Sequence, residues 1–339
     1  MTLYTEKLEK LKIANPTLRD CFDPSSSEFS ESTMEEKIQT LQKVIASGFS
    51  LEQITKEYCR FYEKLNKSYV AKDLHQGLKA LINFLLKKHT AFKLKFIDDY
   101  SKEELIESLR LLLKDTALYP LEVKTIFYKH LVDKRKRYQY KDSDILNPAS
   151  MNISYDEHLN AWAYWQGNLN AEILLIGQDF GDYDYYLKNN GKDEPANATN
   201  INLASLFREL RIELGTSDEP NIDTKLYFTN AVLGVKNGGM SAPIKKSWYV
   251  DTAKLFIKPL IQLIEPKIII VMGSKAYDVA SIIYSLESKP MKELINSNPI
   301  LLGDNMKLFV VYHCSSLGIA NRNFEKQLDD WREIRQHLD

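Results

Sequence analysis

Three residues whose side chains suit acid–base and hydrogen-bonding chemistry, Asp179, Asn230 and His313, each follow a short apolar run of the sequence. A carboxylate can position a water molecule or stabilise a developing positive charge. An imidazole can stabilise a developing negative charge, and a carboxamide donates and accepts hydrogen bonds at the same time. If the fold brings the three residues together, they form a candidate active site.

Each of the three residues also has a structural interpretation when it is taken alone. An Asp after a strand often caps a helix, an Asn in such a place often makes a local turn bond, and a single His is often a structural residue. It is their joint occurrence at successive apolar runs that favours a functional site.

The apolar runs have the composition of buried β-strands, because they lack polar alternation. They are Ile173–Ile176, Leu226–Phe228, Ile268–Val271 and Leu308–Val311. Helical spacing of apolar residues lies between them, at Ala204–Leu214 and Thr252–Ile264. This alternation predicts an α/β fold, a three-layer α/β/α sandwich with a mostly parallel central sheet. Ligands of such folds bind beyond the carboxyl ends of the strands, where the three polar residues would meet.

The first half of the chain is expected to be an all-α N-terminal domain. Three segments have the spacing of a capping box, in which a hydroxyl and an acidic or amide side chain satisfy each other's backbone amides: Ser32–Glu35, Ser50–Gln53 and Ser101–Glu104. The turn-rich segment Lys141–Ser150 has the composition of a linker. We therefore expect a helical domain of unknown role at residues 1–150 and an α/β domain at residues 151–339, opened by a helix with Trp162 and Trp165.

A basic run, Lys134–Arg137, is followed by Tyr138 and Tyr140. Two interpretations stay open for it. The run and its aromatic neighbours can contact phosphates and bases. Alternatively it is the solvated end of a helix, where cations suit the helix dipole.

Composition limits the class of protein. A length of 339 residues suggests about two domains, and the net charge of −1 does not point to a nucleic acid by itself. The sequence has no apolar stretch long enough for a membrane span, and its start lacks the pattern of a signal peptide, so we expect a cytoplasmic protein without membrane contact. Cys21, Cys59 and Cys314 are far apart and form no Cys-x-x-Cys pair. Together with the lack of a phosphate-binding loop, this predicts neither a metal nor a cofactor.

Four segments, in this order, resemble motifs of the uracil-DNA glycosylase superfamily: Gly177-Gln178-Asp179, Thr229–Leu233, Pro266–Gly273 and His313–Leu317. The first resembles the water-activating motif of the superfamily's first family, and the second resembles its uracil-reading strand end. The third is most similar to a strand and turn of the iron–sulfur branch, without the cluster, and the fourth resembles the His-Pro-Ser loop. The resemblance covers about residues 155–335.

The resemblance implies a role for each of nine residues. Asp179 and His313 would be catalytic. Gln178, Phe180 and Asn230 would bind the base, and Ser315, Ser316, Leu317 and Arg322 would bind DNA, with Leu317 filling the space that the flipped base leaves. The implied substrate is uracil or a related damaged base in DNA.

The sequence departs from the family pattern at several positions. Phe180 stands in place of a Pro, Gly181 in place of a bulky Tyr that excludes thymine, and Cys314 in place of the Pro of the His loop. A stacking Phe is not evident, and Phe180, Tyr183 and Tyr185 compete for that role. The segment Lys236–Met240 is expected to be a flexible loop near DNA.

Three classes of function therefore stay open. The first is a base-excision glycosylase, and the second is a module of the same fold that binds a nucleobase or DNA without cleavage. The third is a different small-ligand hydrolase or transferase built on the same sheet. The N-terminal helices would bind a protein partner or DNA, or merely pack on the α/β domain.

Overall fold

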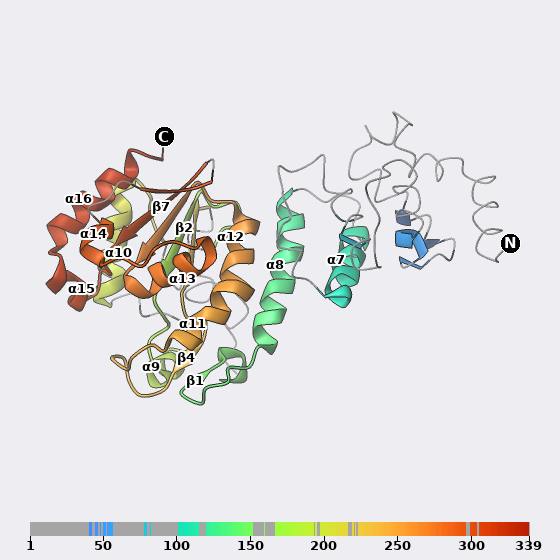
Figure 1. Cartoon of the computed structure of the whole chain (residues 1–339), viewed down its shortest axis with the longest axis horizontal. Helices are drawn as coiled ribbons and strands as arrows, with labels where there is room; N and C mark the ends of the chain where they lie inside the picture. Colours follow the sequence, from blue (N-terminus) through green and yellow to red (C-terminus); the bar gives the residue numbers. More distant parts are fainter. Residues whose placement is uncertain are drawn as a thin grey trace. The chain divides into compact units, whose positions relative to one another are not determined.

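The computed structural model describes residues 101–114, 120–151, 159, 167–192, 194, 197–215, 219, 221, 223–295, 299–303 and 305–338, together with scattered positions between 41 and 82. The chain forms two compact units, Met1–His130 and Leu131–Asp339 (Figure 1). The sequence-based domain limit at residue 150 differs from this division, and the assignment of domains to functions stays a prediction.

The described part of the first unit is helical. Helix α7 spans Lys102–Lys114, and helix α8 spans Pro120–Arg137 and crosses the boundary between the units. The predicted capping box at α7 is confirmed, because the Glu104 amide donates to Ser101 Oγ at 3.1 Å and the Ser101 amide donates to Glu104 Oε2 at 2.7 Å. The all-α nature of the whole N-terminal domain stays a prediction.

The capping box at Ser50 is also confirmed. The Gln53 amide donates to Ser50 Oγ at 3.2 Å, and the Ser50 amide donates to Gln53 Oε1 at 2.9 Å. The third predicted box, Ser32–Glu35, lies outside the described residues, as do Trp162 and Trp165.

The second unit is built on a five-stranded sheet with the order β3-β2-β5-β7-β6. Its strands are β2 (Ile173–Gly177), β3 (Leu226–Asn230), β5 (Ile268–Met272), β6 (Ile300–Leu302) and β7 (Met306–Val311). Strands β3, β2, β5 and β7 run parallel, and only β6 is antiparallel to its neighbour. The four predicted strands and the mostly parallel sheet are therefore confirmed.

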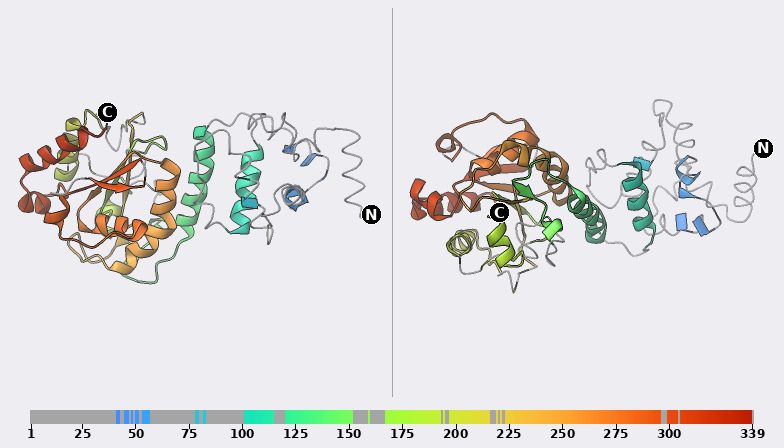
Figure 2. Two further views of the ribbon diagram at one scale, coloured as in Figure 1. Left: turned by 45° about the horizontal axis from the view of Figure 1, so that its top comes forward. Right: turned by 90° about the horizontal axis from the view of Figure 1, so that it is seen from below.

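Helices cover both faces of the sheet, which makes the unit an α/β fold of three layers (Figure 1, Figure 2). Helices α10 (Ala198–Glu209) and α16 (Phe324–Arg335) share one core cluster with alternate residues of the strands, and Trp331 packs edge-on against Phe207 at 4.8 Å between ring centroids. The helical segments α11 (Lys246–Thr252), α12 (Lys258–Ile264) and α13 (Ser274–Tyr284) belong to the other layer. Each fully buried Ile or Leu contributes about 1.5–3 kcal/mol.

Both predicted helices exist with other bounds, and the one predicted at Ala204–Leu214 is α10, which begins at Ala198 and ends at Glu209. The predicted helix Thr252–Ile264 begins earlier, at Lys246, and contains a π-helical turn at Ala253–Ile257. Pro259 follows this turn. Because proline has no backbone N–H and its ring crowds the carbonyl four residues before it, the wider turn accommodates it within one continuous helix.

The remaining elements are short. They are β1 (Ile145–Leu146), a 3₁₀ turn (Pro148–Met151), α9 (Tyr183–Lys188), β4 (Val235–Lys236), α14 (Met291–Ile295) and α15 (Ser316–Asn321). Among the described residues, none of the helices combines the length and the apolar character that a membrane span requires.

The interpretation of Lys141–Ser150 as a linker is wrong. Its residues Ile145 and Leu146 form β1, which pairs antiparallel with β4, and Ile145 is buried. The Asn147 side chain donates to the Arg135 carbonyl at 2.8 Å and to the Tyr138 carbonyl at 2.6 Å. It thereby supplies hydrogen-bond donors to backbone carbonyls at the C-terminal end of α8. The segment is ordered by the hydrogen bonds of the Asn147 side chain and by the two-residue pairing of β1 with β4. Its turn-rich composition gives no sign of either interaction.

The basic run Lys134–Arg137 forms the last turn of α8. Arg135 is buried, and its guanidinium donates to the Leu233 carbonyl at 3.4 Å. Tyr138 donates to Asp251 at 3.0 Å, and burial together with this carboxylate raises the pKa of Tyr138 to about 12. The interpretation as a helix end is therefore the one that the geometry favours.

We predict that Asn147→Ala lowers the free energy of unfolding by about 1–3 kcal/mol, because backbone carbonyls at the end of α8 lose their donor. Chemical denaturation measures this change. The control is Asn237→Ala, because the exposed side-chain carboxamide of Asn237 makes only a 3.5 Å contact with the Ser143 carbonyl. Equal stability of the two variants would contradict the ordering role of Asn147.

Candidate functional site

A cleft of about 630 Å³ opens at the carboxyl edge of the parallel strands. Every predicted site residue except Arg322 lies in its wall: Gln178, Asp179, Phe180, Asn230, His313, Ser315, Ser316 and Leu317. The remainder of the wall comes from strands β2, β3 and β5, from the loops after β2, β4, β5 and β7, and from helices α9, α10, α13, α14 and α15. The predicted convergence of the strand ends is thus what the fold produces.

The carboxylate of Asp179 is held by donors on both of its oxygens. The Gly181 amide donates to Oδ1 at 2.9 Å, and Lys236 Nζ donates to Oδ2 at 3.0 Å. Asp179 is only 10% exposed, so a charged carboxylate at this place needs such partners. The backbone bond to Gly181 closes a local turn, which fixes the plane of the carboxylate.

Lys236 comes from β4 and is almost completely buried, with a side-chain exposure of 2%. The same Nζ that contacts Asp179 also donates to the Met240 carbonyl at 2.8 Å. It thereby closes the glycine-containing segment Lys236–Met240 on itself. The sequence interpretation places Lys236 in a flexible loop and misses this contact.

Asn230 is buried at the end of β3, directly opposite Gly177 of β2. A Cβ atom on Gly177 would lie 2.6 Å from Asn230 Oδ1 and 3.0 Å from Phe228 Cε2. Real side chains do not approach so closely, so only glycine fits here and the carboxamide lies against the bare backbone of the neighbouring strand. The side chain of Asn230 is therefore positioned by close packing of two strands.

His313 follows β7 and is partly buried. The Ser315 amide donates to its Nδ1 at 3.1 Å. Because Nδ1 accepts this bond, the neutral imidazole carries its proton on Nε2, which is left as a donor. Burial lowers the pKa of His313 below the ordinary value of 6.5, and the charge of Asp179 opposes that effect only in part.

The loop that carries His313 is packed very tightly. A Cβ atom on Gly318 would lie 1.6 Å from the His313 carbonyl oxygen, so α15 approaches this peptide through a glycine. Cys314 points into the core, where burial raises its pKa to about 12 and its Sγ lies 3.4 Å from the Thr199 carbonyl. Asn202 donates to the Cys314 carbonyl at 2.9 Å. Contacts with α10 thus hold the loop without a proline.

Two long apolar side chains of the cleft wall are exposed. Leu317, in the first turn of α15, is 76% exposed, and Met240 is 59% exposed. Ser315 precedes α15 as its N-cap residue, yet its hydroxyl makes no capping bond. The hydroxyl group therefore remains available at the edge that carries Leu317.

Phe180 lies in the core although it also borders the cleft. The residue is 3% exposed, and its ring packs edge-on against Tyr186 with ring centroids 5.6 Å apart. Tyr185 is tied by its hydroxyl, which accepts from Asn197 Nδ2 at 3.3 Å. Stacking of a base on Phe180 stays a prediction, while Phe228 and Tyr312 are further aromatic residues of the wall.

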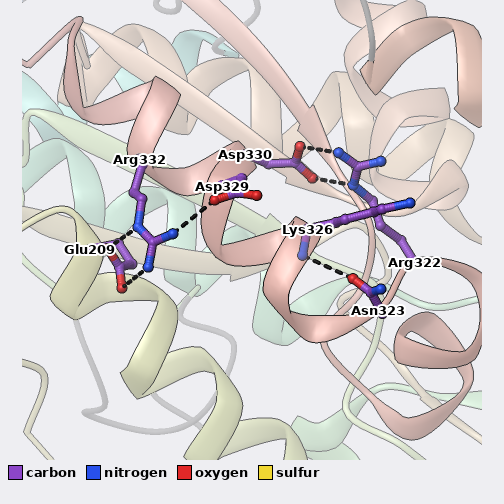
Figure 3. A network of polar contacts seen from close by, with 7 residues as sticks. All are labelled: Glu209, Arg322, Asn323, Lys326, Asp329, Asp330 and Arg332. Carbon is purple, nitrogen blue, oxygen red and sulfur yellow. Dashed lines mark hydrogen bonds and ion pairs between the residues drawn. The ribbon is translucent and has the colours of Figure 1, made fainter.

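Arg322 does not line the cleft, although the preceding residue Asn321 does. Two of the three guanidinium nitrogens of Arg322, Nε and Nη2, contact the carboxylate of Asp330 on α16 (Figure 3). The Arg322 carbonyl accepts from Gln327 Nε2. In the same network, Arg332 binds Glu209 of α10 at 2.8 Å. The network joins helices, and a contact of Arg322 with DNA stays a prediction.

Sequence reasoning missed Lys236 and did not assign a role to Met240. A single lysine in a two-residue strand gives no signal in the sequence, because its partner lies 57 positions earlier. The glycines at 238 and 239, both with positive φ, mark the tight turn that brings Met240 back. Among the described residues, no three His, Cys, Asp or Glu side chains are grouped so that they could hold a metal ion.

A parallel sheet with a cleft at its carboxyl edge, lined by Asp, Asn and His at the ends of β2, β3 and β7, agrees with the family that the sequence motifs suggest. The model of the Uracil DNA glycosylase superfamily matches residues 164–339. The chain therefore belongs to the uracil-DNA glycosylase superfamily. No curated protein matches the chain significantly.

We predict that His313 titrates below 6.5 in the folded protein and that Asp179→Asn lowers its pKa further, because the variant loses the carboxylate that favours the imidazolium. NMR titration of the imidazole resonances, assigned with His313→Gln, measures both values. Since the unfolded chain binds this proton more readily, the folded state should lose stability as the pH falls from about 6.5 through the folded pKa. A His313 pKa above 6.5 would contradict the dominance of burial.

Proposed function

We propose that the chain is a DNA base-excision glycosylase that hydrolyses the N-glycosidic bond of uracil or a related damaged base flipped out of DNA. One observation carries the proposal: Asp179, Asn230 and His313 line a single cleft whose size suits one nucleotide. A base inside a duplex must leave the stack before its glycosidic bond is reached, which costs a few kcal/mol.

Leu317 and its neighbours would contact the DNA. An exposed leucine can fill the space that the flipped base leaves, as apolar side chains do at kinked steps. The hydroxyls and backbone amides of Ser315 and Ser316 would bind phosphates. Arg322 would contribute less, because Asp330 holds its guanidinium.

Asn230 would select the base, with Gln178 beside it in the wall. A carboxamide presents one donor and one acceptor group, which match the O4 and N3–H edge of uracil. Cytosine would leave buried polar groups without partners, and such mismatches discriminate strongly. The close packing of Asn230 on Gly177 fits this role, since a reading group must not move.

Asp179 and His313 would share the chemistry. As the C1′–N bond breaks, the sugar becomes positive and the base takes the bonding electrons. Asp179 would stabilise the sugar and position a water molecule, whose oxygen bonds to C1′ while its proton passes to the carboxylate. His313 would stabilise the negative charge on the base O2 through its Nε2–H, and the departing base then takes a proton from solvent.

A second candidate function is a module that binds a base or DNA without cleaving it. It is favoured by the burial of Phe180 in the core and by the ion pair that occupies one oxygen of Asp179. A different small-ligand hydrolase on the same sheet remains a third prediction. Cytoplasmic localisation and a protein partner at the N-terminal helices also stay predictions.

The test of activity uses the full chain and a labelled oligonucleotide with one uracil, single-stranded or opposite guanine. Alkaline cleavage should reveal abasic sites. Asp179→Asn and His313→Ala should each reduce excision by about 100-fold or more, because each removes a group that acts in the transition state. Ser150→Ala, on the exposed 3₁₀ turn, is the control.

Two results would count against this proposal. Saturable binding of the uracil oligonucleotide without abasic sites favours the binding module. Excision that is unchanged in both variants rejects the assignment of Asp179 and His313.

We further predict that Met240 limits the size of the base. A Cβ atom on Gly181 would lie 2.9 Å from Met240 Sδ, so Met240 occupies the space beside the missing side chain. Met240→Ala should raise excision of thymine relative to uracil by at least about tenfold. The control, Met291→Ala, removes a methionine from another part of the wall. An unchanged thymine-to-uracil ratio would refute the role of Met240.

A further inference from the structure

We propose that Lys236 is a positioning residue that fixes the carboxylate of Asp179 and the cleft residue Met240 from behind the wall. The inference deepens the proposed glycosylase function and rests on it. Its basis is one buried ammonium group with two partners: Asp179 Oδ2 at 3.0 Å and the Met240 carbonyl at 2.8 Å.

The backbone of Lys236 is itself fixed. Strand β4 pairs with β1, with Lys236 opposite Ile145, and a further isolated bridge joins Lys236 to Asp182. Asp182 in turn caps α9 by accepting from the Tyr185 amide at 2.8 Å. The ammonium group is therefore presented from a rigid support rather than from a surface loop.

A buried lysine at this place is costly for stability unless its charge is compensated. An apolar pair in place of both Lys236 and Asp179 would fill the same space without that cost. We therefore explain the charge of Lys236 by the two groups that its ammonium binds, the Asp179 carboxylate and the Met240 carbonyl. With the Gly181 amide on Oδ1 and the ammonium on Oδ2, the carboxylate of Asp179 cannot rotate freely.

The second partner, the Met240 carbonyl, connects Lys236 to another residue of the cleft wall. Because the Met240 carbonyl accepts from the same Nζ, the turn at Gly238 and Gly239 is closed by the group that orients Asp179. The side chain of Met240 then reaches Gly181, two residues after Asp179. One ammonium thus ties the predicted catalytic carboxylate to the residue that limits the base.

Lys236→Met should lower kcat for uracil excision by about 10- to 100-fold with a small change in KM, because a displaced carboxylate misplaces the water. Lys236→Arg should recover part of the loss. In the Asp179→Asn background, Lys236→Met should cause no further loss of kcat. The control is Lys245→Met, which removes an exposed lysine that also contacts two carboxylates, Asp142 and Asp144.

An additional loss of kcat in the Asp179→Asn background would overturn the positioning role, because Lys236 would then act independently of Asp179. An equal loss of kcat in Lys245→Met would overturn it as well.

A thermal unfolding series gives a readout that does not depend on excision. Lys236→Met should lower Tm by roughly 6–12 °C, because it leaves a buried carboxylate without its counter-charge. The double variant Asp179→Asn/Lys236→Met should have a higher Tm than Lys236→Met alone. Additive losses of Tm would refute the coupling. If the wild-type protein excises no base, the glycosylase proposal fails. The thermal unfolding series then tests by itself whether Lys236 is coupled to Asp179.

Discussion

The site depends on the parallel, in-register pairing of β2 with β3, which sets Gly177 opposite Asn230. Strands that are covered on both faces have no polar alternation to fix their register. The close approach at the edge supplies that constraint here. A slip by one residue would bring the side chain of Ile176 against Asn230, where even a Cβ atom lacks room. The glycine that ends β2 thus selects the register and places the carboxamide at the same time.

The charges around the cleft form a coupled set. Burial favours the neutral form of His313, and the negative charge of Asp179 favours the imidazolium. Burial is the larger effect, and Lys236 offsets part of the carboxylate charge. The imidazole therefore stays a neutral donor through Nε2, while the carboxylate keeps a counter-charge that is hidden from the cleft. A site without the lysine would place an uncompensated carboxylate next to the histidine.

The parts that the sequence predicts are those that local patterns determine. The strand runs, the capping box at Ser101 and the meeting of Asp179, Asn230 and His313 follow from composition and from the geometry of parallel sheets. The two-residue strands β1 and β4 have no periodicity, and the ion pairs of Lys236 and Arg322 join residues that only tertiary packing brings together. These contacts could not be read from the sequence, which is why Lys141–Ser150 resembles a linker.

The departures from the family pattern are compensated in space. The proline that is missing at Cys314 would restrict one backbone angle, and contacts with Asn202 and Thr199 hold that loop instead. The bulky side chain that is missing at Gly181 is replaced by Met240, which reaches the same place from another loop. The loop of His313 and the space beside Gly181 are thus filled by other residues of the chain than the family pattern uses.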